Sequence, residues 1–252
     1  MACIDCRSKE DCLYYYMYEK SVAKRGYAPP QRPIIIIPPF LGKTLNLKKD
    51  GYLNIEILLF GEYVKFIPHV LLALRLSGQD GLGADRHYGL NRFEISSAHC
   101  GLLGKHIFDG SKLDLANLEV IDIQNIPVPE IREYKLGFRT PLSQVTFPPL
   151  PQELINLIRN RLIRIVNEYG DGTKIQDANI TGQIIDYQSH FHNLQRRSTR
   201  SNKKIFKGHT GIVEYEIKEI DDVGKWLLVV GELIGAGPDS SFGCGFFKFK
   251  VI

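Results

Sequence analysis

The segment TGIVEYEIKEIDDVGKWLLVVGELIGAGPDSSFGCGFFKFKV, residues 210–251, decides the fold of this chain. Apolar and acidic side chains alternate over residues 213–217, which predicts a strand with one buried face. Asp221 is a favoured N-cap residue for a helix whose apolar stripe continues to Ile234. A glycine-rich loop then leads to a second alternating strand at 247–251. The segment therefore predicts a strand, a helix, a loop and a final strand.

The residues upstream of this segment complete a recognisable order of elements. A strand is expected at 134–140 and a helix at 152–169, where Gly170 provides a C-terminal cap. A further strand is expected at 180–187. The resulting order, strand–helix–strand–strand–helix–strand, is the ferredoxin-like arrangement, an antiparallel sheet with helices on one face. The predicted fold class is α+β.

The amino-terminal half repeats this order only in part. We expect strands at 34–37, 52–60 and 88–97, and a helix that starts near Val64 and ends at Gly78. No first strand and first helix are predicted before them, so the interpretation is tandem ferredoxin-like domains, the first of them incomplete. A looser linker follows, which gives domains 1–130 and 131–252. An incomplete sheet has an exposed edge, which favours a homodimer or a partner segment.

Composition excludes some classes of protein and names no partner. The chain has 252 residues, of which 44% are hydrophobic, enough for one sizeable core or two small ones. The net charge of +4 is too mild to identify a ligand. No run of eighteen apolar residues predicts a transmembrane helix, and the charged start MACIDCRSKEDC is unlike a signal peptide. We expect a cytoplasmic protein.

The cysteines suggest one candidate metal site. Their number, five, is odd and gives no disulfide framework of the secreted type. Cys3, Cys6 and Cys12 can supply three soft ligands for a structural zinc ion, with His99 or Cys100 as a distant fourth. The second pair of a standard zinc site is missing, so ordinary reduced thiols are the alternative interpretation.

The strongest functional signal is a local surplus of basic residues. No Asp or Glu occurs from Tyr187 to Val213. We expect Gln195–His209 to form a long hairpin loop whose cations contact RNA phosphates while the arginine planes stack on bases. The alternative is a solvated basic loop without a partner. The candidate RNA-binding residues in it are Arg196, Arg197, Arg200, Lys203, Lys204, Lys207 and His209.

Three stretches of the chain resemble a known family. They are CIDCRSKEDCLYYYMYE leading to RPIIIIPPF, ILLFGEYVKFIPHVLLALRLSGQDGLGADRHYG, and TGQIIDYQSHFHNLQRRSTRSNKKIFKGHTGIVEYE followed by GELIGAGPDSSFGCGFFKF. In this order they are similar to the CRISPR-associated pre-crRNA processing endoribonucleases of the RAMP superfamily. The resemblance implies tandem ferredoxin-like domains, CRISPR repeat RNA as ligand, and cleavage without a metal or other cofactor that leaves a 2′,3′-cyclic phosphate.

The chain departs from that family in two places. Family members usually carry an additional amino-terminal strand and helix, which in many of them hold a catalytic histidine. Their glycine loop often contains Lys or Arg, whereas Pro238 and Asp239 stand here. The loop glycines, which we expect to be structural first and to contact RNA second, are Gly235, Gly237, Gly243 and Gly245.

Cleavage that forms a cyclic phosphate needs a base, an acid and a cation. His190 and His192 lie two residues apart on a predicted strand, so they share a face and are candidate base and acid. Lys203, or alternatively Lys204, is the candidate cation. Surface or stacking histidines are the alternative. The second function that we consider is a catalytically inactive RAMP-fold subunit that holds guide RNA with other CRISPR-associated subunits, and the third is a ferredoxin-like domain for another partner.

Overall fold

The computed structural model describes two compact units. The described residues are 6–8, 12–20, 22–25, 30–39, 47–82, 88–101, 104–196 and 204–252. The larger unit comprises Met1–Gly61 together with Gln124–Ile252, and the smaller unit comprises Glu62–Ile123. This division differs from the sequence-based boundary at residue 130, which stays a prediction.

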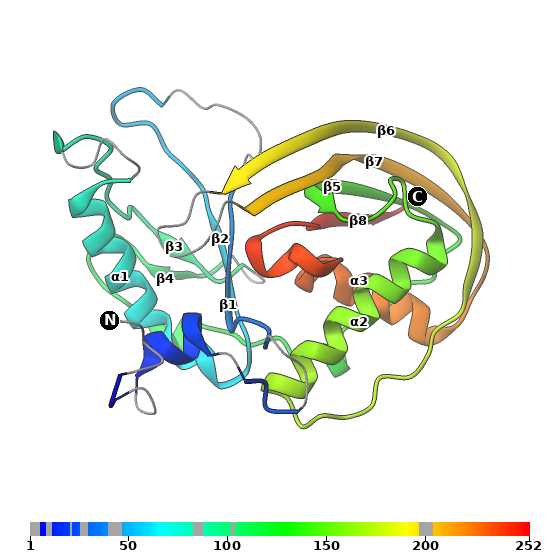
Figure 1. Ribbon diagram of the computed structural model, residues 1–252, viewed down its shortest axis with the longest axis horizontal. Helices are drawn as coiled ribbons and strands as arrows, with labels where there is room; N and C mark the ends of the chain where they lie inside the picture. The colour runs from blue at the N-terminus through cyan, green and yellow to red at the C-terminus, as the bar shows by residue number, and fades with distance from the viewer. Residues whose placement is uncertain are drawn as a thin grey trace. The chain divides into compact units, whose positions relative to one another are not determined.

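The larger unit contains a four-stranded antiparallel sheet with helices α2 and α3 on one face (Figure 1). The strand order is β6-β7-β5-β8. Along the chain the elements follow as strand, helix, strand, strand, helix, strand, which confirms the ferredoxin-like arrangement of the carboxy-terminal half. Their bounds are β5 (Glu133–Ser143), α2 (Pro151–Tyr169), β6 (Ile180–Arg196), β7 (Lys204–Ile220), α3 (Asp222–Ile234) and β8 (Phe247–Val251).

Alternation along β5 and β7 builds the core of this unit. Tyr134, Leu136 and Phe138 of β5 are buried, as are Val213 and Tyr215 of β7. The rings of Tyr134 and Tyr215 stack with centroids 4.8 Å apart. The Tyr215 hydroxyl donates a hydrogen bond to the Pro149 carbonyl over 2.9 Å, which satisfies its polar end. Burial of each such side chain stabilises the fold by about 1.5–3 kcal/mol.

Both helices begin where the sequence predicts. The Asp221 carboxylate accepts a hydrogen bond from the Gly224 amide at 2.7 Å, which caps α3. At the start of α2, the Leu150 amide donates to the Glu153 carboxylate over 3.0 Å. These contacts satisfy backbone donors that have no partner inside the helix.

The amino-terminal part of the larger unit packs against the glycine loop. β1 (Ile34–Ile37) pairs antiparallel with β2 (Glu56–Leu59), and η3 (Tyr15–Glu19) is a short helical turn before them. Ile35 and Ile37 form a buried cluster with Phe246. The predicted strand at 34–37 is confirmed, and the predicted strand at 52–60 is shorter than expected.

The smaller unit differs more from the sequence-based expectation. Its described elements are η4 (Gly61–Phe66), which begins at the last residue of the larger unit, α1 (Ile67–Asp80), β3 (Ala98–His99), β4 (His106–Phe108), η6 (Leu115–Asn117) and η7 (Ile123–Asn125). α1 continues past Gly78, and Gly81 at a φ of +86° follows it. The predicted end at Gly78 is therefore wrong.

The strand predicted at 88–97 is also wrong. The Phe93 amide donates to the Gly78 carbonyl over 3.1 Å, and the Leu82 amide donates to the Asn91 carbonyl over 3.1 Å. The chain thus turns back onto the end of α1, and its hydrogen-bonding groups are used there. Among the described residues, no helix has the length and apolar character needed to cross a bilayer.

Backbone conformation and close packing require glycine at two positions of the glycine loop. Gly245 has a φ of +71°, and a Cβ there would overlap the Ala236 carbonyl oxygen. A Cβ on Gly243, at a φ of +83°, would lie 2.7 Å from the Ile36 carbonyl oxygen of β1. The loop is therefore closely packed, and its glycines are structural.

We predict that Gly245→Ala lowers the free energy of unfolding by more than about 2 kcal/mol, because it adds backbone strain and a steric overlap. Gly137→Ala on β5 is the matched control, since no atom lies within 4 Å of the added methyl group. It should change stability by less than about 1 kcal/mol. Urea unfolding followed by circular dichroism measures both, and equal effects of the two substitutions would contradict the packing argument.

Candidate nucleic-acid interface

β6 and β7 form a long two-stranded ribbon. Each strand has 17 residues, and the pairing runs from Ile180 opposite Ile220 to Arg196 opposite Lys204. Figure 1 shows the two strands curving together past the end of β5. The prediction that Gln195–His209 is one long loop is therefore wrong, because continuous backbone pairing places most of it on strands despite its polar composition. Only residues 197–203 separate the two strands.

Three of the predicted phosphate-binding cations belong to the far part of this ribbon. Arg196 and Lys204 are the last cross-strand pair, so their backbones face each other. Lys207 lies three pairs from them, exposed and opposite Asn193. The remaining predicted cations of this group, Arg197, Arg200 and Lys203, lie outside the described residues. Since the ribbon has no acidic residue between Tyr187 and Val213, this end is positive in charge.

The two candidate catalytic histidines lie side by side on β6. The ring centroids of His190 and His192 are 4.7 Å apart, as expected for residues that share one face of a strand. Their environments differ. His190 is exposed, whereas His192 is 5% exposed and its Nε2 lies 2.7 Å from Thr210 Oγ1 of β7. Their catalytic roles stay a prediction.

His209 belongs to a run of aromatic rings that starts in the core. Its ring stacks on Phe147 with centroids 5.3 Å apart, and it also contacts the Phe191 ring at 5.2 Å. Phe147 in turn meets buried Phe138 at 5.5 Å. His209 Nδ1 is buried and has no hydrogen-bond partner among the described residues. The structure thus gives His209 a packing role, and its predicted contact with RNA stays a prediction.

Sequence reasoning missed two of these aromatic residues. Phe191 and Phe147 belong to different elements, and nothing in their local sequence indicates that His209 joins them. Tyr187 and Phe191 are four residues apart on β6, a spacing that places both rings on one face of a strand. That spacing is the signal that could have identified Tyr187 and Phe191 as neighbours on one face.

The glycine loop directs its acidic residue inward. Asp239, in η8 (Pro238–Phe242), is buried and accepts hydrogen bonds from Ser143 Oγ at 2.8 Å and Gln144 Nε2 at 2.6 Å. Its charge is therefore directed into the protein. The two loop glycines that precede η8, Gly235 and Gly237, have φ values of +78° and +89°. A contact of this loop with RNA stays a prediction.

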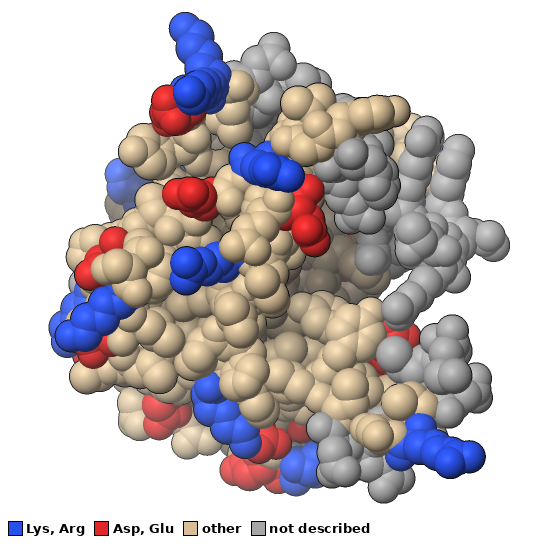
Figure 2. Space-filling view, turned by 90° about the vertical axis from the view of Figure 1, so that its left-hand side faces the viewer, with Lys and Arg blue, Asp and Glu red and all other residues tan. Residues whose placement is uncertain are grey.

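Charge on one side of the molecule is mixed. In the view of Figure 2, lysines and arginines alternate with aspartates and glutamates over the described residues on that side. Such a surface has no strong field of one sign. This distribution agrees with a basic surplus that is local to the ribbon.

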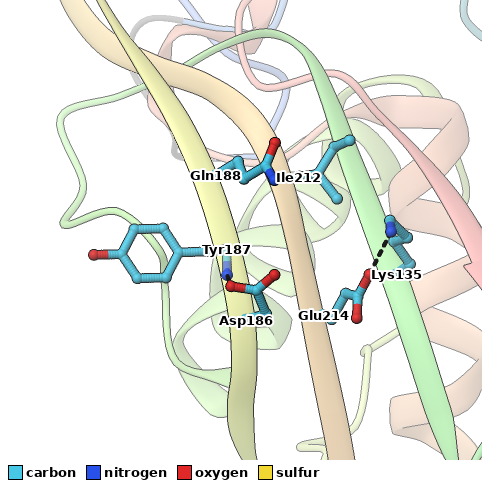
Figure 3. Close-up of a pocket in the computed structure, with 6 residues that line it drawn as sticks. All are labelled: Lys135, Asp186, Tyr187, Gln188, Ile212 and Glu214. Carbon is cyan, nitrogen blue, oxygen red and sulfur yellow. Dashed lines mark hydrogen bonds and ion pairs between the residues drawn. The ribbon is translucent and has the colours of Figure 1, made fainter.

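The face of the sheet that points away from the helices carries a small polar pocket. Figure 3 shows its lining residues, among which Lys135 and Glu214 form an ion pair. Its volume of about 50 Å³ is far below that of a typical ligand site, roughly 300–1,000 Å³. Asp186 and Glu214 place carboxylates in this pocket, so the pocket is a poor site for phosphate. The Tyr187 ring points away from the ion pair (Figure 3).

The predicted zinc ligands are only partly within the described chain. Cys6 and Cys12 are half-buried free thiols, and Cys3 lies outside the described residues. The described residues contain no group of three or more His, Cys, Asp or Glu side chains arranged to hold a metal ion. A structural zinc at Cys3, Cys6 and Cys12 stays a prediction.

Comparison with known proteins identifies two matching family models and one relative that matches over nearly the whole chain. Residues 1–119 match AF_1859_N, an N-terminal domain, and residues 134–249 match AF_1859_C, a C-terminal domain. A protein of Archaeoglobus fulgidus, described as uncharacterized, is 38% identical to this chain over 250 residues. The match covers 99% of this chain and 83% of that protein.

Solved structures resemble the fold at low sequence identity. A chain of the partial Cas6-RT-Cas1–Cas2 complex is similar with a TM-score of 0.52 and 14% identity, over 97% of this chain and 43% of that chain. Thermus thermophilus Cas6 has a TM-score of 0.48 and 13% identity, over 88% of this chain and 81% of that chain. The first of these likenesses confirms an α+β fold with tandem ferredoxin-like domains.

The burial of the two histidines leads to a stability prediction. His192→Ala removes a buried ring and leaves Thr210 Oγ1 without this partner, so it should lower the free energy of unfolding by about 1–3 kcal/mol. His190→Ala should change it by less than about 0.5 kcal/mol, because His190 is exposed. Thermal unfolding at neutral pH compares the two variants. A larger loss for His190→Ala would show that the assigned environments are reversed.

Proposed function

This chain belongs to the family of the AF_1859_N and AF_1859_C domain models, and we propose that it binds CRISPR repeat RNA and cleaves pre-crRNA to crRNA. The observation that carries the proposal is the part of the β6–β7 ribbon between residues 187 and 213, a basic extension of a ferredoxin-like sheet that has no Asp or Glu. The likeness of the fold to a chain of a Cas6-containing complex supports the choice of RNA.

RNA binding follows from the charge of the ribbon. Six lysines and arginines lie between Tyr187 and Val213, where no carboxylate offsets them. Cations of this kind bind RNA mainly by neutralising phosphates and releasing counterions. The guanidinium planes at the end of the ribbon can also stack on unpaired bases.

The proposed cleavage needs no cofactor. A base removes the proton of a ribose 2′-hydroxyl, and the 2′ oxygen bonds to the adjacent phosphorus. The bond between phosphorus and the 5′ oxygen then breaks, and that oxygen takes up a proton, so the products are a 2′,3′-cyclic phosphate and a 5′-hydroxyl. Histidine suits the proton transfer because its pKa lies near neutral pH.

The environments of the candidate residues favour different roles for them. His190 is exposed beside the basic end of the ribbon, so we propose it as the base. His192 is the other candidate for proton transfer expected from sequence, but with 5% exposure it is better placed to orient the neighbouring His190 ring than to reach RNA. Lys203, the cation that the sequence suggests for the charge on the phosphorane, lies outside the described residues, and the neighbouring Lys204 is six cross-strand pairs from His190, so this role stays a prediction.

A second function is favoured by the burial of His192. If only one histidine is accessible, the chain can serve as a catalytically inactive subunit that holds guide RNA. Its proposed partners are then other CRISPR-associated proteins or a second copy of this chain. The similar Cas6-RT-Cas1–Cas2 complex is an assembly of several such components, and the likeness to one of its chains supports the proposal.

Cleavage of an end-labelled CRISPR repeat RNA in the presence of EDTA tests the enzymatic proposal. We expect a single cut that leaves a cyclic phosphate, resolved on a sequencing gel. His190→Ala should slow it by about 100-fold or more because it removes the base. His106→Ala, an exposed histidine of the smaller unit, is the control and should cleave normally. Binding without cleavage by the unmodified protein would establish the inactive subunit instead.

The salt dependence of RNA binding tests the ribbon as the phosphate-binding element. If all six cations contact phosphate, the plot of log Kd against log salt has a slope of about 4, at about 0.7 per contact. Lys207→Ala should lower the slope by about 0.7. Lys174→Ala, at an exposed lysine outside the ribbon, should leave it unchanged. Equal slopes for both variants would place the phosphates elsewhere.

A further inference from the structure

The β6–β7 ribbon presents aromatic rings on one of its faces. Tyr187 is 51% exposed and Phe191 is 54% exposed. Their cross-strand partners are Val213 and His209, so both rings lie on the face that continues the helix-covered side of the sheet. Large exposed aromatic side chains are candidate contact points for a ligand, since their exposure to water is unfavourable.

The ring of Phe191 is held in place from the core. It contacts His209, which stacks on Phe147, which contacts buried Phe138. Successive ring centroids along this run are 5.2–5.5 Å apart. A ring that is already fixed loses little conformational freedom when a ligand stacks on it, so its binding is preorganised.

The cross-strand pair between the two exposed rings has only small side chains. The cross-strand pair Ser189–Gly211 lies between them, and a Cβ on Gly211 would overlap the Gln188 carbonyl oxygen. The Cα atoms of Tyr187 and Phe191 are about 13 Å apart at about 3.3 Å per strand residue. Each ring therefore has an open flank on which a flat group can lie.

Charge determines which flat group fits this face. The ribbon has no acidic residue from Tyr187 to Val213, and Lys207 lies on the same face as the rings. The opposite face of the sheet has Asp186, Glu214 and the Lys135–Glu214 ion pair. A polyanion with exposed aromatic bases therefore suits the aromatic face and is disfavoured only beside Asp186 and Glu214 on the other.

We propose that Tyr187 and Phe191 form a stacking site for unpaired bases, so the ribbon recognises single-stranded RNA rather than a duplex. His209 positions Phe191 and does not itself contact the base. This inference rests on the proposed RNA-binding function and names the class of RNA segment bound by this site. Bases in a duplex are already stacked on one another and cannot lie on these rings.

Fluorescence anisotropy with labelled decauridylate and with an RNA duplex of the same length tests this proposal. The unmodified protein should bind the single strand more tightly. Tyr187→Ala and Phe191→Ala should each weaken single-strand binding by about 5- to 150-fold, with the slope of the salt dependence unchanged. Duplex binding should change little. Ile212→Ala, at an exposed residue on the opposite face, is the control and should bind as the unmodified protein does.

A spectroscopic variant reports stacking directly. The chain has one tryptophan, Trp226. In Phe191→Trp, the added tryptophan emission should be quenched when decauridylate binds, relative to the unmodified protein, and affinity should be retained. Phe191→Leu keeps an apolar side chain but should lose affinity, because it has no π face.

The outcomes separate this site from the proposed function. If the unmodified protein binds decauridylate and the two alanine variants bind it equally well, the stacking site is wrong and the RNA-binding function stands. Equal losses for single strand and duplex would also overturn the stacking of unpaired bases. If the unmodified protein binds neither probe, the RNA-binding function itself fails.

Discussion

The long pairing of β6 with β7 is the constraint on which the functional surface depends. After two register shifts near its start, the pairing is uninterrupted from Asp186 opposite Glu214 to Gln195 opposite Ile205 and assigns each side chain there to one of two faces. A shift by one residue would exchange the faces. β7 also pairs with β5, and its Tyr215 is fully buried, so the ribbon is anchored in the core of the sheet. The positions of the histidines and aromatic rings follow from that anchoring.

A second set of contacts fixes the glycine loop beside this sheet. Buried Arg161 of α2 donates to the Ile234 carbonyl at the end of α3 over 2.5 Å and to Gln31 Oε1 over 3.1 Å. Ser241 Oγ donates to the same Gln31 oxygen over 2.8 Å. Burial lowers the pKa of the Arg161 guanidinium to about 9, although it stays a cation near neutral pH. The cation faces the carbonyl end of α3, where positive charge is favourable.

The carboxy-terminal half of the fold could be predicted from sequence because its signals are local. The cap at Asp221, the apolar stripe of α2 and the alternation in β7 each depend on a few neighbouring residues. The length of the ribbon could not be predicted, because polar residues such as Gln188 and Asn193 do not favour strands. Backbone pairing between distant residues supplies the missing stabilisation. The strand predicted at 88–97 is wrong for a similar reason, since its segment bonds to the end of α1.

The candidate site was predictable in composition and not in geometry. The acid-free run and the spacing of His190 and His192 are visible in the sequence. The burial of His192 depends on its neighbours across the ribbon. The support of Phe191 depends on Phe147, which lies in a different part of the chain, so sequence reasoning could not connect them. The difference in burial between the two histidines, and the aromatic face, can be seen only once the pairing of β6 with β7 is known.

Photo-cross-linking of 4-thiouridine-labelled repeat RNA, with mass spectrometry of the linked peptides, tests the central claim that RNA lies along the ribbon. The account predicts that cross-links concentrate in peptides of β6 and β7 and that unlabelled RNA competes for them. Cross-links confined to the open face of β5 and β8, or to residues 62–123, would contradict it.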